Sequence, residues 1–197
     1  NTSKEKSGRE YIGKIDWTQS LTLNQSLGNI TLNPRQFADF YLLLKSGEAK
    51  DGTGRPIAKS ELNQILDEIF TIRDPWRSEW LDADFKICDA KGNVIDPNLK
   101  NGRMSLFTQH RLENGILVPT QKFDVENIYL KEDSKFEFPN LNEFGLPTKE
   151  GDSGFNYWRP CRDNISVARF IANSNDAYLN CISNPTNYSG RLGVRAV

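Results

Sequence analysis

The spacing of apolar residues changes once along this 197-residue chain, and the change restricts the folds open to it. Between residues 33 and 70, apolar residues recur at intervals of three or four, which is typical of helices that bury one face. From Leu81 onward they alternate with polar residues, which is typical of strands. Two early helices followed by strand segments predict the α+β class.

Residues at the ends of the two helical stretches predict where each helix begins and stops. Asn33 can cap the first helix, Pro34 suits its first turn and Gly47 can end it. Ser60 can cap the second helix, and Pro75 lies just beyond its end. The apolar stripes of both helices are expected in the core: Phe37, Phe40, Tyr41, Leu44, Leu62, Ile65, Leu66, Ile69 and Phe70.

Period-two alternation predicts the strands. We expect a first strand at Tyr11–Trp17 and another at Leu81–Cys88. Met104–Arg111 and Leu117–Val125 are expected to pair through a turn at residues 113–115. We therefore expect one domain over residues 1–197, with two early helices, short antiparallel strands and long ordered loops.

One segment, Lys131–Ser153, has no periodic pattern and is rich in Pro, Asn and Gly. A loop of this length in a compact domain is usually functional or held by its own packing. Its apolar residues are expected to hold it in place: Phe136, Phe138, Leu141, Phe144 and Leu146.

Charge and composition exclude some classes of partner. Lys and Arg number 25 against 26 Asp and Glu, without a lysine-rich tract, so nucleic acid is not expected as a partner. The longest apolar run, near residues 40–44, is too short to span a bilayer, so no membrane span is expected in this sequence. No heptad pattern argues for assembly, which leaves a monomer as the default.

The few residues that could support chemistry have simpler interpretations. Cysteines 88, 161 and 181 lack zinc-ligand spacing and are expected to be free thiols, although a Cys161–Cys181 bridge is open. His110, the only histidine, is expected to be a surface or hydrogen-bonded residue. Asp82 and Asp84 share a strand face and are expected to be solvated. The sequence therefore predicts no enzyme activity, no cofactor and no metal.

Near the end of the chain, Ala177–Ile182 alternates between two kinds of side chain. Ala177, Leu179 and Cys181 suit a core, whereas Tyr178, Asn180 and Ile182 mix aromatic, amide and aliphatic groups on the other face. Such a mixture on an exposed strand face favours binding over packing, because it combines contact area with orienting hydrogen bonds.

Residues 161–197 contain no Lys, Glu, Gln, Met or Trp, although a share proportional to the first 160 residues would be about eight. These five are the residues that an Asn codon cannot become when its two adenines are replaced and its third base stays a pyrimidine. An Asn- and Ser-rich surface loop is the alternative explanation. A mutational bias at adenines would produce this pattern.

Two segments carry a resemblance to a known family: PWRSEWLDADFK at residues 75–86 and DNISVARFIANSNDAYLNCISNPTNYSGRLGVRAV at residues 163–197. They resemble variable proteins of diversity-generating retroelements, of the archaeal or bacterial type with a C-type lectin fold. SVARF, Asn184-Pro185 and LGVR are the specific pieces, and the resemblance covers most of Asn33–Val197. It implies a C-type lectin-like fold, in the variant of formylglycine-generating enzymes.

The resemblance also implies a function. In this family an error-prone reverse transcriptase rewrites the 3' end of the gene at adenines, so that one scaffold displays a hypervariable surface. We therefore expect a non-enzymatic ligand-binding protein whose variable region lies at about residues 161–191 and whose ligand is an unknown protein or glycan. The localisation is unknown. Display on a cell surface would require an element outside this sequence.

Positions divide into fixed and variable by the same resemblance. The fixed framework is matched at Ser166–Phe170, Ala172, Ser174, Ala177, Leu179, Cys181, Pro185 and Leu192–Arg195. The variable, ligand-binding positions are Ile165, Ile171, Asn173, Asn175, Asp176, Tyr178, Asn180, Ile182, Ser183, Asn184, Asn187, Tyr188, Gly190 and Arg191. Tyr178 and Tyr188 are the expected anchors, since aromatic residues dominate binding hot spots. Arg169 and Arg195 are expected to make internal hydrogen bonds.

The motifs present in this chain argue against two other functions that the fold would allow. Formylglycine-generating enzymes need a closely spaced cysteine pair, whereas Cys161 and Cys181 are twenty residues apart. Calcium-dependent lectins of this fold use acid-Pro-Asn and Trp-Asn-Asp motifs, and this chain has neither. The main alternative is a non-diversified lectin-like adhesin or carbohydrate-binding module.

Overall fold

The computed structural model describes residues 2–4, 10–72, 74–189 and 192–195. Within them the chain is α+β, as expected, but it has three α-helices where two were expected. The helices are α1 (Trp17–Ser26), α2 (Pro34–Ser46) and α3 (Lys59–Phe70), with a short 3-10 helix η1 (Phe138–Asn140). The strands are β1 (Thr2–Lys4), β2 (Glu10–Gly13), β3 (Arg77–Cys88), β4 (Arg103–Glu113), β5 (Ile116–Asp124), β6 (Ser134–Phe136), β7 (Phe155–Trp158), β8 (Val167–Ala172), β9 (Ala177–Ser183) and β10 (Leu192–Arg195).

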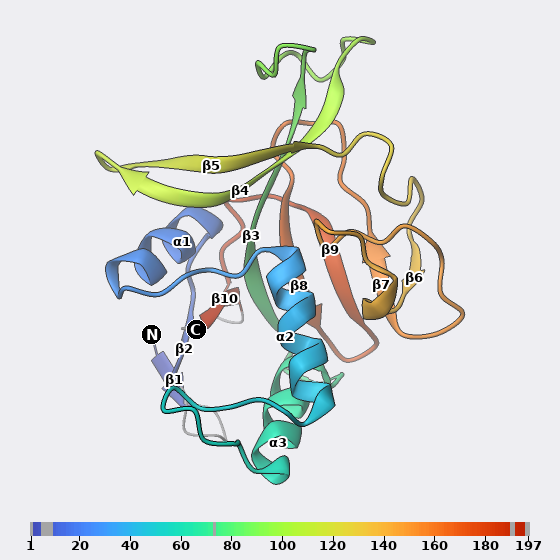
Figure 1. Ribbon diagram of the computed structural model, residues 1–197. Helices are drawn as coiled ribbons and strands as arrows, with labels where there is room; N and C mark the ends of the chain where they lie inside the picture. Colours follow the sequence, from blue (N-terminus) through green and yellow to red (C-terminus); the bar gives the residue numbers. More distant parts are fainter. Residues whose placement is uncertain (1, 5–9, 73, 190–191, 196–197) are drawn as a thin grey trace.

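The described strands form one mixed sheet in the order β1-β2-β10-β3-β8-β9-β7-β6, with the β4–β5 hairpin branching from β3 (Figure 1). The β10–β3 and β7–β9 pairs are parallel, and β3 has 12 residues. The expectation of only short antiparallel strands is therefore wrong. β3 is long because its first half pairs with β8 and its second half with β4, so one strand serves both the main sheet and the hairpin.

The helix that was predicted to start after Asn33 is α2 in the structure, and both of its predicted ends are confirmed. The Asn33 side chain accepts a hydrogen bond from Gln36 N, and Gln36 Oε1 accepts one from Asn33 N, which forms a capping box. Gly47 ends the helix with a φ of 78°. By contrast, α3 begins after Ala58, so Ser60 lies inside the helix and does not cap it.

The helix α1 was not predicted, because residues 11–17 were assigned to a strand. Only Glu10–Gly13 is strand, and Asp16 then caps α1 by accepting a hydrogen bond from Gln19 N at 2.7 Å. The large apolar side chains that α1 buries are Trp17 and Leu21, because its other buried residues are polar. Such a short stripe gives little helical periodicity to read from the sequence.

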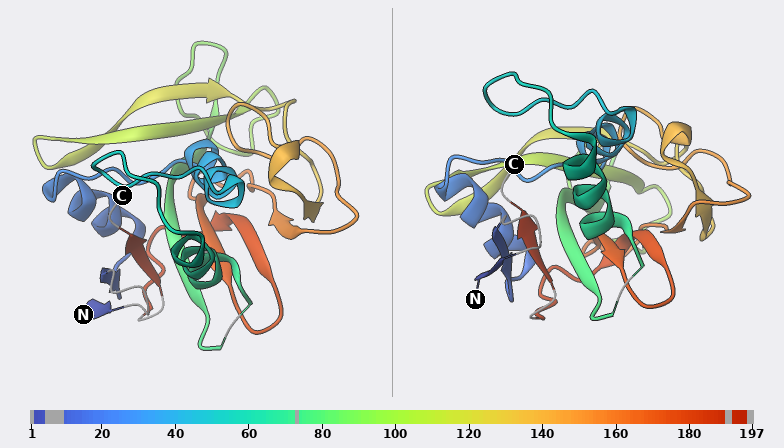
Figure 2. Two further views of the ribbon diagram at one scale, coloured as in Figure 1. Left: turned by 60° about the horizontal axis from the view of Figure 1, so that its bottom comes forward. Right: turned by 90° about the horizontal axis from the view of Figure 1, so that it is seen from below.

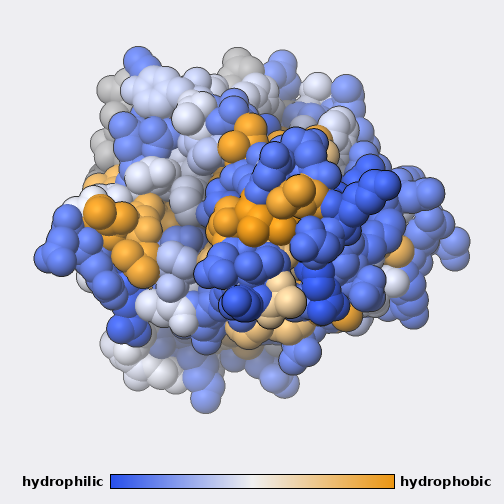
Figure 3. Space-filling view, turned by 90° about the horizontal axis from the view of Figure 1, so that it is seen from above, coloured by the Kyte–Doolittle hydropathy of each residue, from blue (hydrophilic) through white to orange (hydrophobic). Residues whose placement is uncertain are grey.

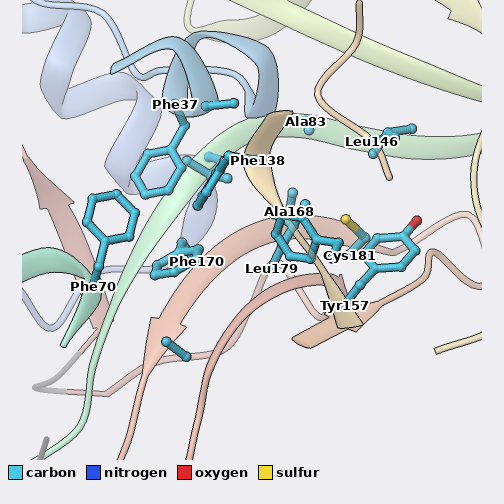
Figure 4. Close-up of a cluster of buried hydrophobic side chains, with 14 of the residues drawn as sticks. Phe37, Phe70, Ala83, Phe138, Leu146, Tyr157, Ala168, Phe170, Leu179 and Cys181 are labelled. Carbon is cyan, nitrogen blue, oxygen red and sulfur yellow. The ribbon is translucent and has the colours of Figure 1, made fainter. Parts of the chain in front are cut away.

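The main core lies between the sheet and the two helices α2 and α3, which pack on the same face of β3, β8 and β9 (Figures 1 and 2). Phe37, Phe70 and Phe170 meet there with ring centroids 5.1–5.4 Å apart, and Phe138 closes the cluster (Figure 4). These rings come from α2, α3, β8 and η1, so the cluster joins early and late parts of the chain.

The segment between residues 131 and 153 is held by its own side chains, as predicted. Phe136, Phe138 and Leu146 are buried within the main core. The segment contributes the short strand β6, which pairs with β7, and the helix η1. It therefore forms the edge of the sheet beside β7 and is not a free loop.

A second, smaller core lies on the other face of β3 and β8. It is formed by Trp17, Leu21, Trp80 and Val167. The Trp17 indole donates to Leu81 O at 2.9 Å, and the Trp80 indole donates to Ile15 O at 3.1 Å. The chain entering α1 is thus fastened to the middle of β3 on the face opposite α2 and α3.

The contact between the segment at residues 131–153 and the start of α2 can be tested at Gly145. Its φ is 78°, and an added Cβ would overlap the backbone of Pro34 and Arg35 at the start of the helix. Gly115 in the β4–β5 turn has a similar φ of 81° but faces open space. We expect Gly145→Ala to lower the free energy of unfolding by about 3 kcal/mol, and Gly115→Ala by only about 1 kcal/mol, in urea titrations. Equal losses would contradict the close approach.

Candidate functional site

The face of β7, β8 and β9 that points away from α2 and α3 carries the side chains best placed to bind a ligand. Cross-strand register puts Trp80, Arg169, Asn180 and Trp158 in one row across β3, β8, β9 and β7. Neighbouring strands are about 4.8 Å apart, so the row spans about 14 Å. Tyr178 lies in the next row of the same face. We call Trp158, Arg169 and Tyr178 the open sheet face, and Asn180 lies buried in the row between Arg169 and Trp158.

Two aromatic side chains form the accessible part of the open sheet face. Trp158 and Tyr178 stack with ring centroids 5.8 Å apart and an angle of 25° between their planes. The Trp158 side chain is 43% exposed and Tyr178 is half-buried. Asn173 Nδ2 donates to the Tyr178 hydroxyl at 3.4 Å and helps to fix the ring. Rigid aromatic side chains that are half-exposed provide large contact area at low entropic cost.

Arg169 lies between the aromatic pair and the second core. Its guanidinium is 5.7 Å from the ring centroid of Trp80, and its Nε is buried without a hydrogen-bond partner. Burial lowers the pKa of this guanidinium, and the Tyr178 hydroxyl opposes the shift. The expectation that Arg169 makes internal hydrogen bonds is therefore wrong within the described residues, because its position in mid-sheet faces an indole ring and no loop carbonyl. The side chain of Arg195 lies outside those described.

The predicted variable positions divide by exposure. Exposed positions are Ile165, Asn175, Asp176, Asn184, Asn187 and Tyr188, and half-buried positions are Asn173, Tyr178 and Ile182. Ile171, Asn180 and Ser183 are buried, and Gly190 and Arg191 lie outside the described residues. The alternation predicted for β9 is confirmed on its core face, where Ala177, Leu179 and Cys181 are all buried.

Three predicted ligand contacts are corrected by their burial. Ile171 is 3% exposed, in β8 between Ser78 of β3 and Tyr178 of β9. Asn180 is 6% exposed, and its Oδ1 accepts hydrogen bonds from Ser183 Oγ at 2.6 Å and from Ile182 N at 3.2 Å. These bonds close the irregular end of the β8–β9 ladder and bury Ser183 as well. The three residues are structural and do not face a ligand.

The two expected anchors do not lie together. Tyr178 is in β9 beside Trp158, whereas Tyr188, 58% exposed, is in the loop that follows β9. That loop is bound to the start of the chain, since Lys14 N donates to Ser189 O and Lys14 Nζ lies 6.0 Å from the Tyr188 ring centroid. Tyr188 thus belongs to the β2 side of the sheet. The open sheet face is centred on Tyr178 alone.

Trp158 is a functional candidate that the sequence did not predict, because it lies before the expected variable region at residues 161–191. A signal was present, since Asn156 and Trp158 alternate with the aromatic residues Phe155 and Tyr157 directly before that region. Tyr157 is buried in the core and Trp158 points the other way, as a strand requires.

Asp82 and His110 form a buried pair, which corrects the expectation that Asp82 is solvated. His110 Nδ1 lies 2.5 Å from Asp82 Oδ1, and His110 N donates to Asp82 Oδ2 at 2.9 Å. Trp17 packs edge-on against the imidazole, with the ring centroids 5.1 Å apart. The β3–β4 ladder ends at the pair Asp84 and Phe107, so the Asp82 carboxylate replaces the backbone partners that β4 has lost.

Asp84 is also shielded from water, contrary to expectation. Its side chain is 15% exposed, and burial raises the pKa of this carboxyl although Lys86 Nζ, 2.9 Å away, opposes the shift. A cavity of about 310 Å³ reaches His110 and is lined also by Gln25, Gln36 and Arg111. A His–Asp pair can move protons. Within the structure described, the pair joins β3 to β4 through the imidazole and the amide of His110.

The described part of the chain holds no cluster of three or more His, Cys, Asp or Glu side chains that could bind a metal ion. None of its helices combines the length and the apolar character that crossing a bilayer requires.

Apolar residues also gather in patches on the upper side of the molecule, between hydrophilic ones (Figure 3). Exposed apolar side chains of this part of the chain include Leu112 and Ile116 at the β4–β5 turn and Val94 and Leu99 after β3. The β8–β9 turn lies at the opposite end of the sheet (Figure 1). These patches are therefore separate from the open sheet face.

Comparison with protein-family models, with curated proteins and with solved structures finds no match for this chain. The fold and the surface themselves define the class: an α+β protein with aromatic side chains exposed on one face of its sheet.

The reactivity of the three cysteine thiols tests whether the inner face of the β8–β9 hairpin is buried. All three are free thiols, which closes the question of a Cys161–Cys181 bridge. Burial raises the pKa of the Cys181 thiol, and Cys88 is buried as well, whereas Cys161 is half-exposed. With a chromogenic disulfide reagent at pH 8, we expect one fast-reacting thiol in the native protein and three in urea. Cys161→Ser should remove the fast phase, and rapid reaction of Cys181 would contradict its burial.

Proposed function

We propose that this protein is a non-enzymatic, diversifiable ligand-binding protein with a C-type lectin-like fold, varied at its C-terminal surface by adenine-directed retroelement mutagenesis. The ligand contacts the open sheet face and the β8–β9 turn. The hypervariable positions that reach solvent lie in the turn, in β9 and in the segments before β8 and after β9, with Tyr178 as the anchor.

One coincidence carries the proposal. The segment that lacks Lys, Glu, Gln, Met and Trp contains β8 and β9, whose outward side chains include Tyr178 and Ile182 next to the exposed Trp158. A mutational bias in the DNA acts on codons independently of where the encoded residues lie in the folded protein. The exposed positions around the turn, such as Asn175 and Asp176, can accept it because surface substitutions typically change stability by under about 0.5 kcal/mol.

The fold assignment rests on the resemblance and on three features compatible with it. The helices α2 and α3 pack on one side of the sheet, β2 and β10 pair with each other although they are far apart in the sequence, and a long ordered segment precedes β7. The fixed pieces also have structural roles. Phe170 of SVARF is in the main core, and Pro185 O accepts a hydrogen bond from Trp17 N.

A non-diversified lectin-like adhesin or carbohydrate-binding module is the second candidate. The observation in its favour is the stacked, exposed pair of Trp158 and Tyr178, since planar aromatic surfaces also suit sugar rings. This candidate does not explain the missing residue types.

Sequencing the DNA that adjoins the gene tests the proposal. We expect a near-copy of the 3' end that differs only where the copy has adenines, next to a reverse-transcriptase gene. The differing codons should encode exposed residues of the turn, of β9 and of the segments that flank the hairpin, and the codons for SVARF should be identical. A genome without such a copy would contradict diversification and favour the second candidate.

A further inference from the structure

The open sheet face contains a positive charge that no carboxylate of the described residues neutralises. Arg169 forms no ion pair with any described carboxylate, and its Nε has no hydrogen-bond partner. An arginine remains protonated at physiological pH even when its pKa falls, so the charge persists. Leaving a partly buried charge without a partner is costly, and a ligand anion would remove that cost.

The surroundings of Arg169 favour a planar, monovalent anion. Trp80 packs 5.7 Å from the guanidinium on one side, and the Tyr178 and Trp158 pair lies one and two strands away on the other. These rings shield the site from water, which strengthens a charge-assisted hydrogen bond. A guanidinium fork fits a carboxylate through two parallel hydrogen bonds. Lys135, exposed on β6, adds a second positive charge in the row of Tyr178 and Asn156.

We propose that the open sheet face binds a protein partner through an Asp or Glu side chain held by Arg169, with an adjacent apolar side chain of the partner against Trp158 and Tyr178. Trp, Tyr and Arg are the residue types that dominate protein–protein hot spots, and here they are neighbours on one face. An acidic sugar offers the same carboxylate and is treated as an outcome of the test.

This inference rests on the proposed function and adds to it a fixed requirement for a carboxylate on the ligand. Arg169 belongs to the fixed SVARF motif, and Trp158 precedes the variable region. Every variant of the surface would therefore keep the same requirement for a carboxylate. The variable residues, such as Asp176 and Tyr178, would decide which acidic partner is chosen.

A random-peptide display library selected on the immobilised full chain is the experiment. We expect enriched peptides to share an Asp or Glu beside an apolar residue. Replacing that acid by its amide should weaken binding to the wild-type chain at least about tenfold, the loss of one charge-assisted hydrogen bond. Arg169→Gln should bind the acid and amide peptides equally, and Arg169→Lys should retain part of the preference. Unchanged melting temperatures serve as the folding control.

The other outcomes separate this inference from the proposed function. Peptides whose binding is lost in Tyr178→Ala but is indifferent to the acid and to Arg169→Gln would overturn the carboxylate rule and keep the binding face. A glycan array that yields acidic sugars bound through Arg169, with no enriched peptide, would overturn the protein partner. Binding unaffected by Trp158→Ala, Tyr178→Ala and Arg169→Gln would overturn the proposed binding face itself.

Discussion

The middle of β3 is the constraint on which the rest of the structure depends. The ladder of β3 with β8 is irregular between Trp80 and Asp84, and Trp80, Leu81 and Asp82 bond there to three other parts of the chain. The Trp80 indole donates to Ile15 O, Leu81 O accepts from the Trp17 indole, and Asp82 N donates to Leu32 O. The Asp82 carboxylate meanwhile fixes β4. This segment therefore positions α1, the entry to α2 and the β4–β5 hairpin together.

That arrangement explains how a binding surface can vary without loss of the fold. The helices α2 and α3 bury one face of β8 and β9 through a cluster of aromatic rings, and α1 covers only the end of the other face near Trp80. Asn173 and Asn180 hold the backbone of the turn and of β9 through their Oδ1 atoms, which accept from the amides of Asn175, Asp176 and Ile182. Recognition is thus left to the exposed and half-buried side chains of the hairpin, such as Asn175, Asp176 and Tyr178.

Much of the fold followed from periodicity and end residues, because capping and alternation are local. The cap at Asn33, the stop at Gly47 and the core face of β9 were predicted for that reason. The helix α1 was missed because Trp17 and Leu21 give it too short an apolar stripe. The burial of Ile171 and Asn180 and the pair of Asp82 with His110 depend on neighbours from distant strands, which period-two alternation cannot reveal.

The central claim is that solvent-accessible and buried positions of the hairpin differ in their tolerance of substitution. It is tested most directly by two display libraries with the third codon base held as a pyrimidine, scored by the fraction of variants that resist protease. One library randomises Asn175, Asp176, Tyr178 and Ile182, and the other randomises Ile171, Asn180 and Ser183. Most members of the first library should remain folded and most of the second should be cleaved. Equal resistance of the two libraries, or collapse of the first, would contradict the account.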